Sequence, residues 1–222
     1  MKKIFYFLCV FFLMLPASSD GVLGDDHNKN FYAKGKLAFP VYNNIIGDSD
    51  FTRKNARFMI FSTLILGVKP SPNYSLELEG FYRKFDFKRF IAAYGATQEF
   101  VLTSYGILLN VAVHPTKIQA NSFEPFFGAG AGYGYNKARD IITTTSSVIP
   151  GAGSIQGQHT DNFVWQLFVG IDYKCKCEKD FRITADLRWM QFNHIKHRFS
   201  DSSVTNPKLS SLVLSLGAKY YF

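Results

Sequence analysis

The chain ends in Ser215-Leu216-Gly217-Ala218-Lys219-Tyr220-Tyr221-Phe222, where apolar or small residues occupy every second position. The alternation extends back to Leu212, while Ser215 and Lys219 belong to the opposite set, which is mostly polar or small. Side chains point alternately to the two faces of a strand. The stretch therefore predicts a strand with one apolar and one mostly polar face.

The opposite end of the chain has the features of a secretory signal peptide. Met1-Lys2-Lys3 precedes an apolar run from Ile4 to Leu15, and small residues follow up to Ser19. This order predicts a signal peptide over residues 1–19, a short periplasmic segment over 20–30 and a membrane domain over 31–222. The apolar run is too short for a membrane-spanning helix, which needs about 20 residues.

The composition fits a membrane domain made of strands. Aromatic residues reach 17%, yet the mean hydropathy is −0.03 and the net charge is +8. A helical membrane protein would be far more apolar, whereas barrel strands that are half polar give this balance.

About eight stretches of roughly ten residues alternate in polarity along the chain. We expect strands at Phe31–Pro40, Arg57–Lys69, Tyr74–Arg83, Phe100–Val113, Phe123–Tyr135, Phe163–Tyr173, Phe181–Gln191 and the C-terminal stretch. A soluble sandwich would bury the aromatic faces in a core, whereas a barrel turns them toward lipid. Aromatic residues at both ends of the apolar faces, together with the even number of strands, favour an all-β, eight-stranded antiparallel transmembrane β-barrel.

The expected connections alternate between short and long. The short ones are Lys69–Asn73, His114–Asn121 and Lys174–Asp180, and the long ones are Val41–Ala56, Lys84–Thr97, Lys137–Asp161 and Asn193–Lys208. Short periplasmic turns and long external loops are typical of barrels in the bacterial outer membrane. We therefore expect that location, with the long loops at the cell surface.

Charged residues lie on the predicted inward faces of the strands. They are Lys34, Lys36, Glu77, Glu79, Arg83, Asp172, Arg182, Asp186, Arg188 and Lys219. The lumen of an eight-stranded barrel is just wide enough for side chains to fill, and buried ions must pair. A packed salt-bridge network is the favoured interpretation, and a gated ion path is the alternative. Inward glycines from Gly128 to Gly134 would give the long cationic side chains room.

Two loops carry the candidate partner-binding residues. Phe85, Phe87, Lys88 and Arg89 interleave aromatic rings with cations, as binding hot spots do. The same residues would also suit the headgroup zone, where lipopolysaccharide or other anionic lipid attracts cations. Lys196 and Arg198 add positive charge to the last loop.

The basic loops favour acidic partners. We expect outer-membrane lipid around the barrel and, at the surface, sulfated glycans or acidic patches on host serum or matrix proteins. Nucleic acid is not expected as a partner of an exported chain.

The remaining candidates for chemistry are few. Cys175 and Cys177 form a C-x-C pair that predicts either a strained disulfide or two tolerated thiols, and not a zinc site. His194 and His197 are expected in a solvated basic loop without further metal ligands. No histidine lies in the predicted spanning part of a strand, so we expect no enzyme activity, no catalytic residues and no cofactor.

Four motifs resemble a known family. Residues 123–133 resemble the fifth-strand signature of the opacity/OmpA-like small barrels, and residues 165–173 and 183–189 resemble the strands that follow it. Ser215, Gly217, Tyr220 and Phe222 lie in a pattern that resembles the terminal signal read by the barrel-assembly machinery.

The resemblance implies an eight-stranded barrel, and some members of the family bind host serum or matrix proteins through their external loops. The basic, aromatic-rich chain also resembles the surface antigens of obligate intracellular alphaproteobacteria, including rickettsial small-barrel adhesins. The expected role is an adhesin-like surface antigen. A purely structural barrel and a small gated channel are the alternatives.

Overall fold

The computed structural model describes residues 30–46, 51–52, 61–91, 96–115, 122–144, 159–175, 178–193, 197–198, 204–205 and 208–222. The long strands are β1 (Phe31–Ile46), β3 (Phe61–Ser71), β4 (Tyr74–Ile91), β5 (Ala96–Val113), β6 (Phe123–Thr144), β7 (His159–Lys174), β8 (Phe181–Phe192) and β11 (Lys208–Tyr221). Two-residue strands are β2 (Phe51–Thr52), β9 (His197–Arg198) and β10 (Val204–Thr205). The predicted signal peptide lies outside the described residues.

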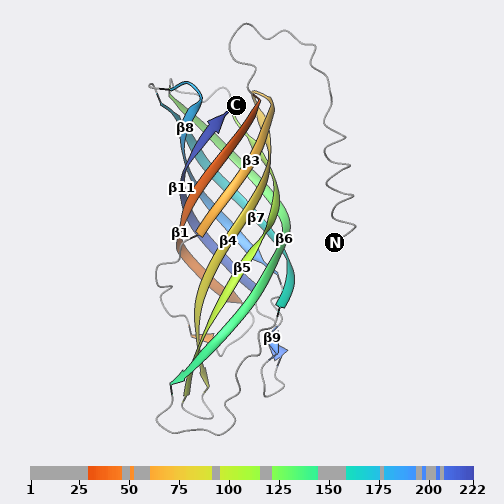
Figure 1. The fold of residues 1–222 in the computed structure, drawn as a ribbon, viewed down its shortest axis with the longest axis vertical. Coiled ribbons are helices and arrows are strands. Elements are labelled where there is room, and N and C mark those ends of the chain that lie inside the picture. The colour runs from red at the N-terminus through yellow and green to blue at the C-terminus, as the bar shows by residue number, and fades with distance from the viewer. Residues whose placement is uncertain are drawn as a thin grey trace.

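The long strands close into a single antiparallel barrel (Figure 1). Strand β1 pairs with β3 on one side and with β11 on the other, so that Lys34 lies opposite both Ile65 and Lys219. Strands β4 and β5 complete the ring. Closure pairs the backbone groups of every long strand, as a lipid environment demands. The predicted eight-stranded fold is confirmed. Within the described part of the chain, no helix is long and apolar enough to cross a membrane.

Side chains alternate between lumen and exterior as the sequence predicted. On β11, Leu214, Leu216 and Tyr220 are 41–48% exposed, whereas Ser215 and Lys219 are at most 1% exposed. The exterior is apolar and the interior is largely polar, which reverses the arrangement of a soluble protein. The described barrel therefore presents to its surroundings a surface suited to hydrocarbon.

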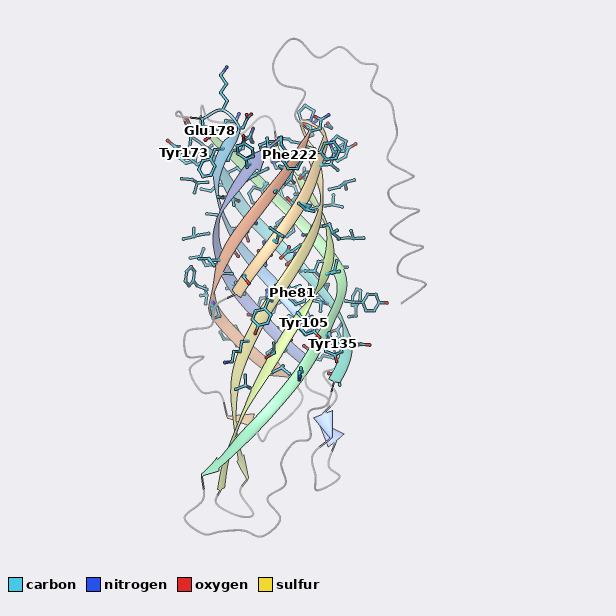
Figure 2. All side chains as sticks on the ribbon, in the orientation of Figure 1. Phe81, Tyr105, Tyr135, Tyr173, Glu178 and Phe222 are labelled. Atoms are coloured by element: carbon cyan, nitrogen blue, oxygen red, sulfur yellow. The ribbon has the colours of Figure 1, made fainter. Side chains whose placement is uncertain are left out.

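Aromatic pairs lie toward both ends of this apolar surface. Phe123 and Tyr173 have ring centroids 5.0 Å apart near the end with the short turns, and Tyr105 and Tyr135 lie 4.9 Å apart farther along the barrel (Figure 2). From Val113, which precedes the short turn, β5 takes eight residues to reach Tyr105, or about 27 Å at ~3.4 Å per residue. Strands of such barrels tilt by about 40°, so this length of strand spans about 20 Å along the barrel axis. That height is close to the ~25 Å apolar band of outer-membrane barrels.

Several strands are longer than predicted. Strand β4 continues to Ile91 and β5 begins at Ala96, so most of the expected loop Lys84–Thr97 is paired strand. The physical reason is that backbone pairing does not stop at the membrane surface. Residues 84–88 still alternate with a period of two, although the apolar set moves from the even-numbered to the odd-numbered positions there.

Two further boundaries differ in the same way. Strand β6 runs to Thr144, well into the expected loop Lys137–Asp161, and β1 runs to Ile46. Strand β3 begins at Phe61, and residues 53–60, where we expected its start, lie outside the described residues. Together, β4, β5 and β6 extend past the rest of the barrel at the end opposite the C-terminus (Figure 1).

Candidate functional site

The centre of the lumen is a polar network around Glu79. This residue on β4 is fully buried, and its Oε1 accepts a 2.6 Å hydrogen bond from Arg188 Nη1 on β8. Its Oε2 accepts hydrogen bonds of 2.8 Å from Asn110 on β5 and Gln166 on β7. Arg188 Nε also donates to Asp186 Oδ1 at 2.8 Å. Three other strands thus supply partners for one carboxylate, which satisfies the requirement that buried charge be paired.

Two lysines of β1 extend the network toward the end with the short turns. Lys34 Nζ lies 2.5 Å from Glu77 Oε1, and the Tyr32 hydroxyl donates to the same oxygen at 2.7 Å. Lys36 Nζ lies 2.5 Å from Asp186 Oδ2. These contacts join β1 to β4 and β8 across the lumen and fill it with paired side chains.

The network ends in a cluster at the mouth next to the short turns, which is the periplasmic end in barrels of this class. Glu124 of β6 is approached by Arg182 Nη1, by Lys174 Nζ at 3.1 Å and by Lys69 Nζ at 3.9 Å. We call Glu124 and these three cations the inner-mouth cluster.

Immediately deeper, Lys219 Nζ lies 2.8 Å from Asp172 Oδ2, and both residues are fully buried. The predicted inward residues thus all lie in the lumen or at this mouth. Glu124 and Lys69 were not among them.

Beyond Glu79, toward the extended strands, the lumen is lined by buried polar side chains, among them Ser104, Asn136 and Asn162, and by buried apolar ones. The apolar ones are Ala38, Phe81, Leu102, Val164, Met190, Phe192, Leu209 and Val213, and we call this set the apolar collar. Arg83 lies within it, 5.7 Å from the Phe81 ring, 5.3 Å from the Phe192 ring and in contact with Met190 Sδ. The collar separates the charged network from the extended end of the barrel.

The glycines of β6 admit close packing inside the lumen. A Cβ on Gly130 would lie 1.8 Å from Asn110 Oδ1, and one on Gly132 would lie 2.0 Å from the backbone oxygen of Ile107. Room on this wall is therefore taken by the side chains and backbone of β5, rather than only by the long cations that we expected opposite.

A serine–histidine pair went unnoticed in the sequence. Ser75 Oγ and His114 Nε2 lie 3.1 Å apart, and both residues are buried. Burial, followed by the nearby charges of Lys69 and Lys219, lowers the pKa of His114 to about 3. The imidazole is therefore a weak base, and no acid among the described residues bonds its Nδ1. The pair has the geometry of a buried structural hydrogen bond.

The candidate partner-binding residues are divided between separate elements. Phe85, Phe87, Lys88 and Arg89 belong to the extended part of β4, where a loop was expected, and their side chains lie outside the described residues. Lys88 and Arg89 pair on one side with β2 and on the other with β5. Arg198 belongs to β9, which pairs with β10 in a separate small sheet, and Lys196 lies outside the described residues.

The remaining candidates lie near the periplasmic end. Cys175 is partly exposed and has no disulfide partner among the described residues, but Cys177 lies outside them, so the disulfide remains a prediction. Tyr220 and Phe222 are 44% and 60% exposed on the outer face, and the Phe222 amide donates to Phe31 O at 3.0 Å. In the described part of the chain, no three histidine, cysteine or acidic side chains group as metal ligands would.

Comparison with known proteins gives a likeness of structure only. No protein-family model matches the chain, and no curated protein sequence matches it. A major outer membrane protein from Thermus thermophilus has a TM-score of 0.53 at 11% identity, covering 88% of this chain and all of the other. Neisserial surface protein A has a TM-score of 0.51 at 12% identity, covering 86% of this chain and 97% of the other.

These likenesses agree with the closed barrel and its apolar exterior. The chain has the fold and the outer surface of a bacterial outer-membrane protein.

Proposed function

We propose that the chain is an outer-membrane surface antigen whose extended strands and external loops bind host molecules. The observation that carries this proposal is the length of β4, β5 and β6. Pairing of β4 with β5 continues for nine residues beyond Tyr82, to Ile91 opposite Ala96. At ~3.4 Å per residue this is about 30 Å of strand beyond an aromatic row that marks the membrane interface.

The extension is a stiff display element rather than a loose loop. Strand β6 pairs with β5 as far as Thr144 opposite Thr97, and β2 pairs with Lys88 and Arg89 of β4. Backbone pairing fixes the residues along the extension, and a fixed surface loses little conformational entropy on binding. The phenylalanine and cationic residues that alternate in the sequence of this extension suit an acidic partner such as a sulfated glycan or an acidic patch of a host protein.

The test shortens the extension in register. Deleting residues 88–91 together with 96–99 removes four cross-strand pairs, from Lys88–Glu99 to Ile91–Ala96. Binding of the purified barrel to a heparin-type glycan and to a panel of host serum proteins should fall at least tenfold. Heat-modifiable gel mobility of the refolded barrel should remain, because the deletion lies outside the ring.

Two double variants separate the effect of side-chain contact with the partner from the effect of strand length. Lys88→Ala with Arg89→Ala should weaken binding, whereas Glu178→Ala with Lys179→Ala, exposed at the opposite end, should not. Undiminished binding by the shortened barrel would exclude the extended strands as the contact surface.

A purely structural role is the second candidate, and the packed lumen favours it. Paired charges from all sides fill the interior without a ligand, so the barrel is complete as a membrane-filling element. If the full-length barrel binds no member of the host panel, this role replaces the proposed one.

A further inference from the structure

The inner-mouth cluster holds more positive than negative charge. Lys69, Lys174 and Arg182 all approach one carboxylate, that of Glu124. The next pair inward, Lys219 with Asp172, balances itself at 2.8 Å. Three basic side chains thus meet one carboxylate, and Lys174 and Arg182 alone outweigh its charge, at a place where Glu124 is only 6% exposed and screening by water is weak.

The hydrogen-bond donors of this cluster also outnumber their acceptors. Lys69 Nζ is 3.9 Å from Glu124 Oε2, beyond hydrogen-bond distance. Lys174 Nζ can donate three hydrogen bonds, and it makes one contact with Glu124, at 3.1 Å. Arg182 uses Nη1 toward Glu124, while its buried Nε has no partner. Ammonium and guanidinium groups converging in this way are the usual partners of tetrahedral oxyanions.

His114 lies next to this cluster. The residue follows β5 and is 1% exposed, and its Nδ1 has no hydrogen-bond partner. Lys69 and Lys219 contribute to the lowering of its pKa to about 3, after burial. The imidazole thus experiences the excess positive charge of the mouth and offers an additional polar atom at its base.

The cluster is accessible from the periplasmic side. Lys174 is 43% exposed, whereas Lys69 and Arg182 are each 14% exposed, so the cations line the wall from the rim inward. The nearby turn carries Glu178 and Lys179, both exposed, and the partly buried Asp180, and Phe222 is held at the same end by its backbone. Exposed groups are screened by water and compensate buried charge weakly.

We propose that the inner-mouth cluster is a binding site for a phosphate-class oxyanion entering from the periplasm. Lys174 at the rim attracts the anion, and Lys69 and Arg182 bind it beside Glu124. The site lies at the opposite end of the barrel from the extended strands and does not rest on the proposed host binding.

The test uses inorganic phosphate and the detergent-refolded full barrel. At constant ionic strength, with chloride as the exchanged anion, phosphate should produce saturable NMR shifts of the His114 ring and the Lys174 side chain. Lys174→Gln should weaken binding about tenfold, since one charge-assisted hydrogen bond contributes about that factor. Arg182→Gln should weaken it further.

Lys179→Gln is the matched control, because it removes an exposed lysine from the same end and should leave binding unchanged. Shifts that rise linearly without saturation, or equal affinities in the Lys174→Gln and Lys179→Gln barrels, would overturn the proposal. Lys174 is the least buried of the three cations, so its variant should fold even if the Arg182 variant does not.

A second set of measurements, in lipid nanodiscs, identifies whether the bound phosphate group belongs to a lipid or to a soluble ion. Barrels in phosphatidylcholine nanodiscs are compared with barrels in nanodiscs that also contain phosphatidylglycerol. Apparent affinity for inorganic phosphate that falls in the anionic nanodiscs supports a lipid headgroup as occupant, and unchanged affinity supports a soluble phosphate. Either result supports the site, whereas absence of saturable phosphate binding in both overturns it.

Discussion

Arg188 is the residue on which most of the central network depends. Its guanidinium contacts Glu79 at 2.6 Å and Asp186 at 2.8 Å, and each of these side chains is at most 2% exposed. Replacing Arg188 with methionine would leave Glu79 buried without its cation, which costs about 3–5 kcal/mol. Adding Glu79→Gln to that variant should recover part of the loss, because the uncompensated carboxylate is removed.

Urea unfolding in detergent micelles measures both variants. Leu187→Met is the control, since Leu187 is adjacent in sequence, faces outward and is 40% exposed. If Arg188→Met unfolds at the same urea concentration as the control, the network does not stabilise the barrel. If the double variant is less stable than the single one, the cost does not come from the stranded carboxylate.

Gly132 tests how tightly the β6 wall packs. A methyl group there would lie 2.0 Å from the backbone oxygen of Ile107, which cannot rotate away. Gly132→Ala should therefore destabilise the barrel by about 1–3 kcal/mol, the usual cost of overpacking. Gly35→Ala is the matched control on an outward position, where a Cβ meets nothing within 4 Å. Equal urea midpoints for the two variants would show that the wall can open to accept a side chain.

In the C-terminal strand β11, assembly in cells and stability of the folded barrel can be tested separately. Tyr220 and Phe222 face outward and contribute no side chain to the lumen, and β11 is also paired with β1 and β8 through every residue from Leu209 to Lys219. If these aromatics form an assembly signal, Tyr220→Ser with Phe222→Ser should reduce the amount of folded barrel in cells several-fold. The same barrel refolded in detergent should keep nearly its original urea midpoint.

Leu214→Ser is the control, because Leu214 is a similarly exposed outward residue of the same strand. A reduction in cells as large for Leu214→Ser as for the aromatic pair would indicate general loss of apolar surface rather than a signal.

Alternation along each strand was enough to predict which side chains enter the lumen, because the period of two follows directly from strand geometry. The same rule would have found Glu124 and His114, which share the parity of the inward residues Gly128 and Asn110. Glu124 stands at the start of a predicted strand and His114 at the start of an expected turn, so neither is among the predicted inward residues.

Partner identity could not be predicted in this way. Lys36 pairs with Asp186, 150 residues away, and that contact depends on the stagger of β1, β11 and β8 around the ring. The alternation of side chains along one strand does not determine how far neighbouring strands are shifted relative to one another. The ends of β4 and β5 were also missed, since amphipathic patterning reports the membrane boundary whereas backbone pairing continues past it.

At the scale of the whole barrel, the arrangement of the lumen opposes steady ion flow. An ion entering from the periplasmic mouth first meets the inner-mouth cluster and then a network whose carboxylates are already paired with Lys34, Lys36 and Arg188. Beyond that it meets the apolar collar, where dehydration is costly. We therefore expect no sustained conductance from the purified barrel in a planar bilayer.

A collar variant makes this expectation sharper. Phe81→Ser with Phe192→Ser removes two rings that lie 6.0 Å apart in the collar, yet it leaves the charged network intact. If the paired charges alone close the lumen, this variant stays silent. If the collar is the main barrier, it conducts while Arg188→Met does not. Sustained, porin-like currents from the unmodified barrel would contradict the filled lumen and restore the gated channel as the leading role.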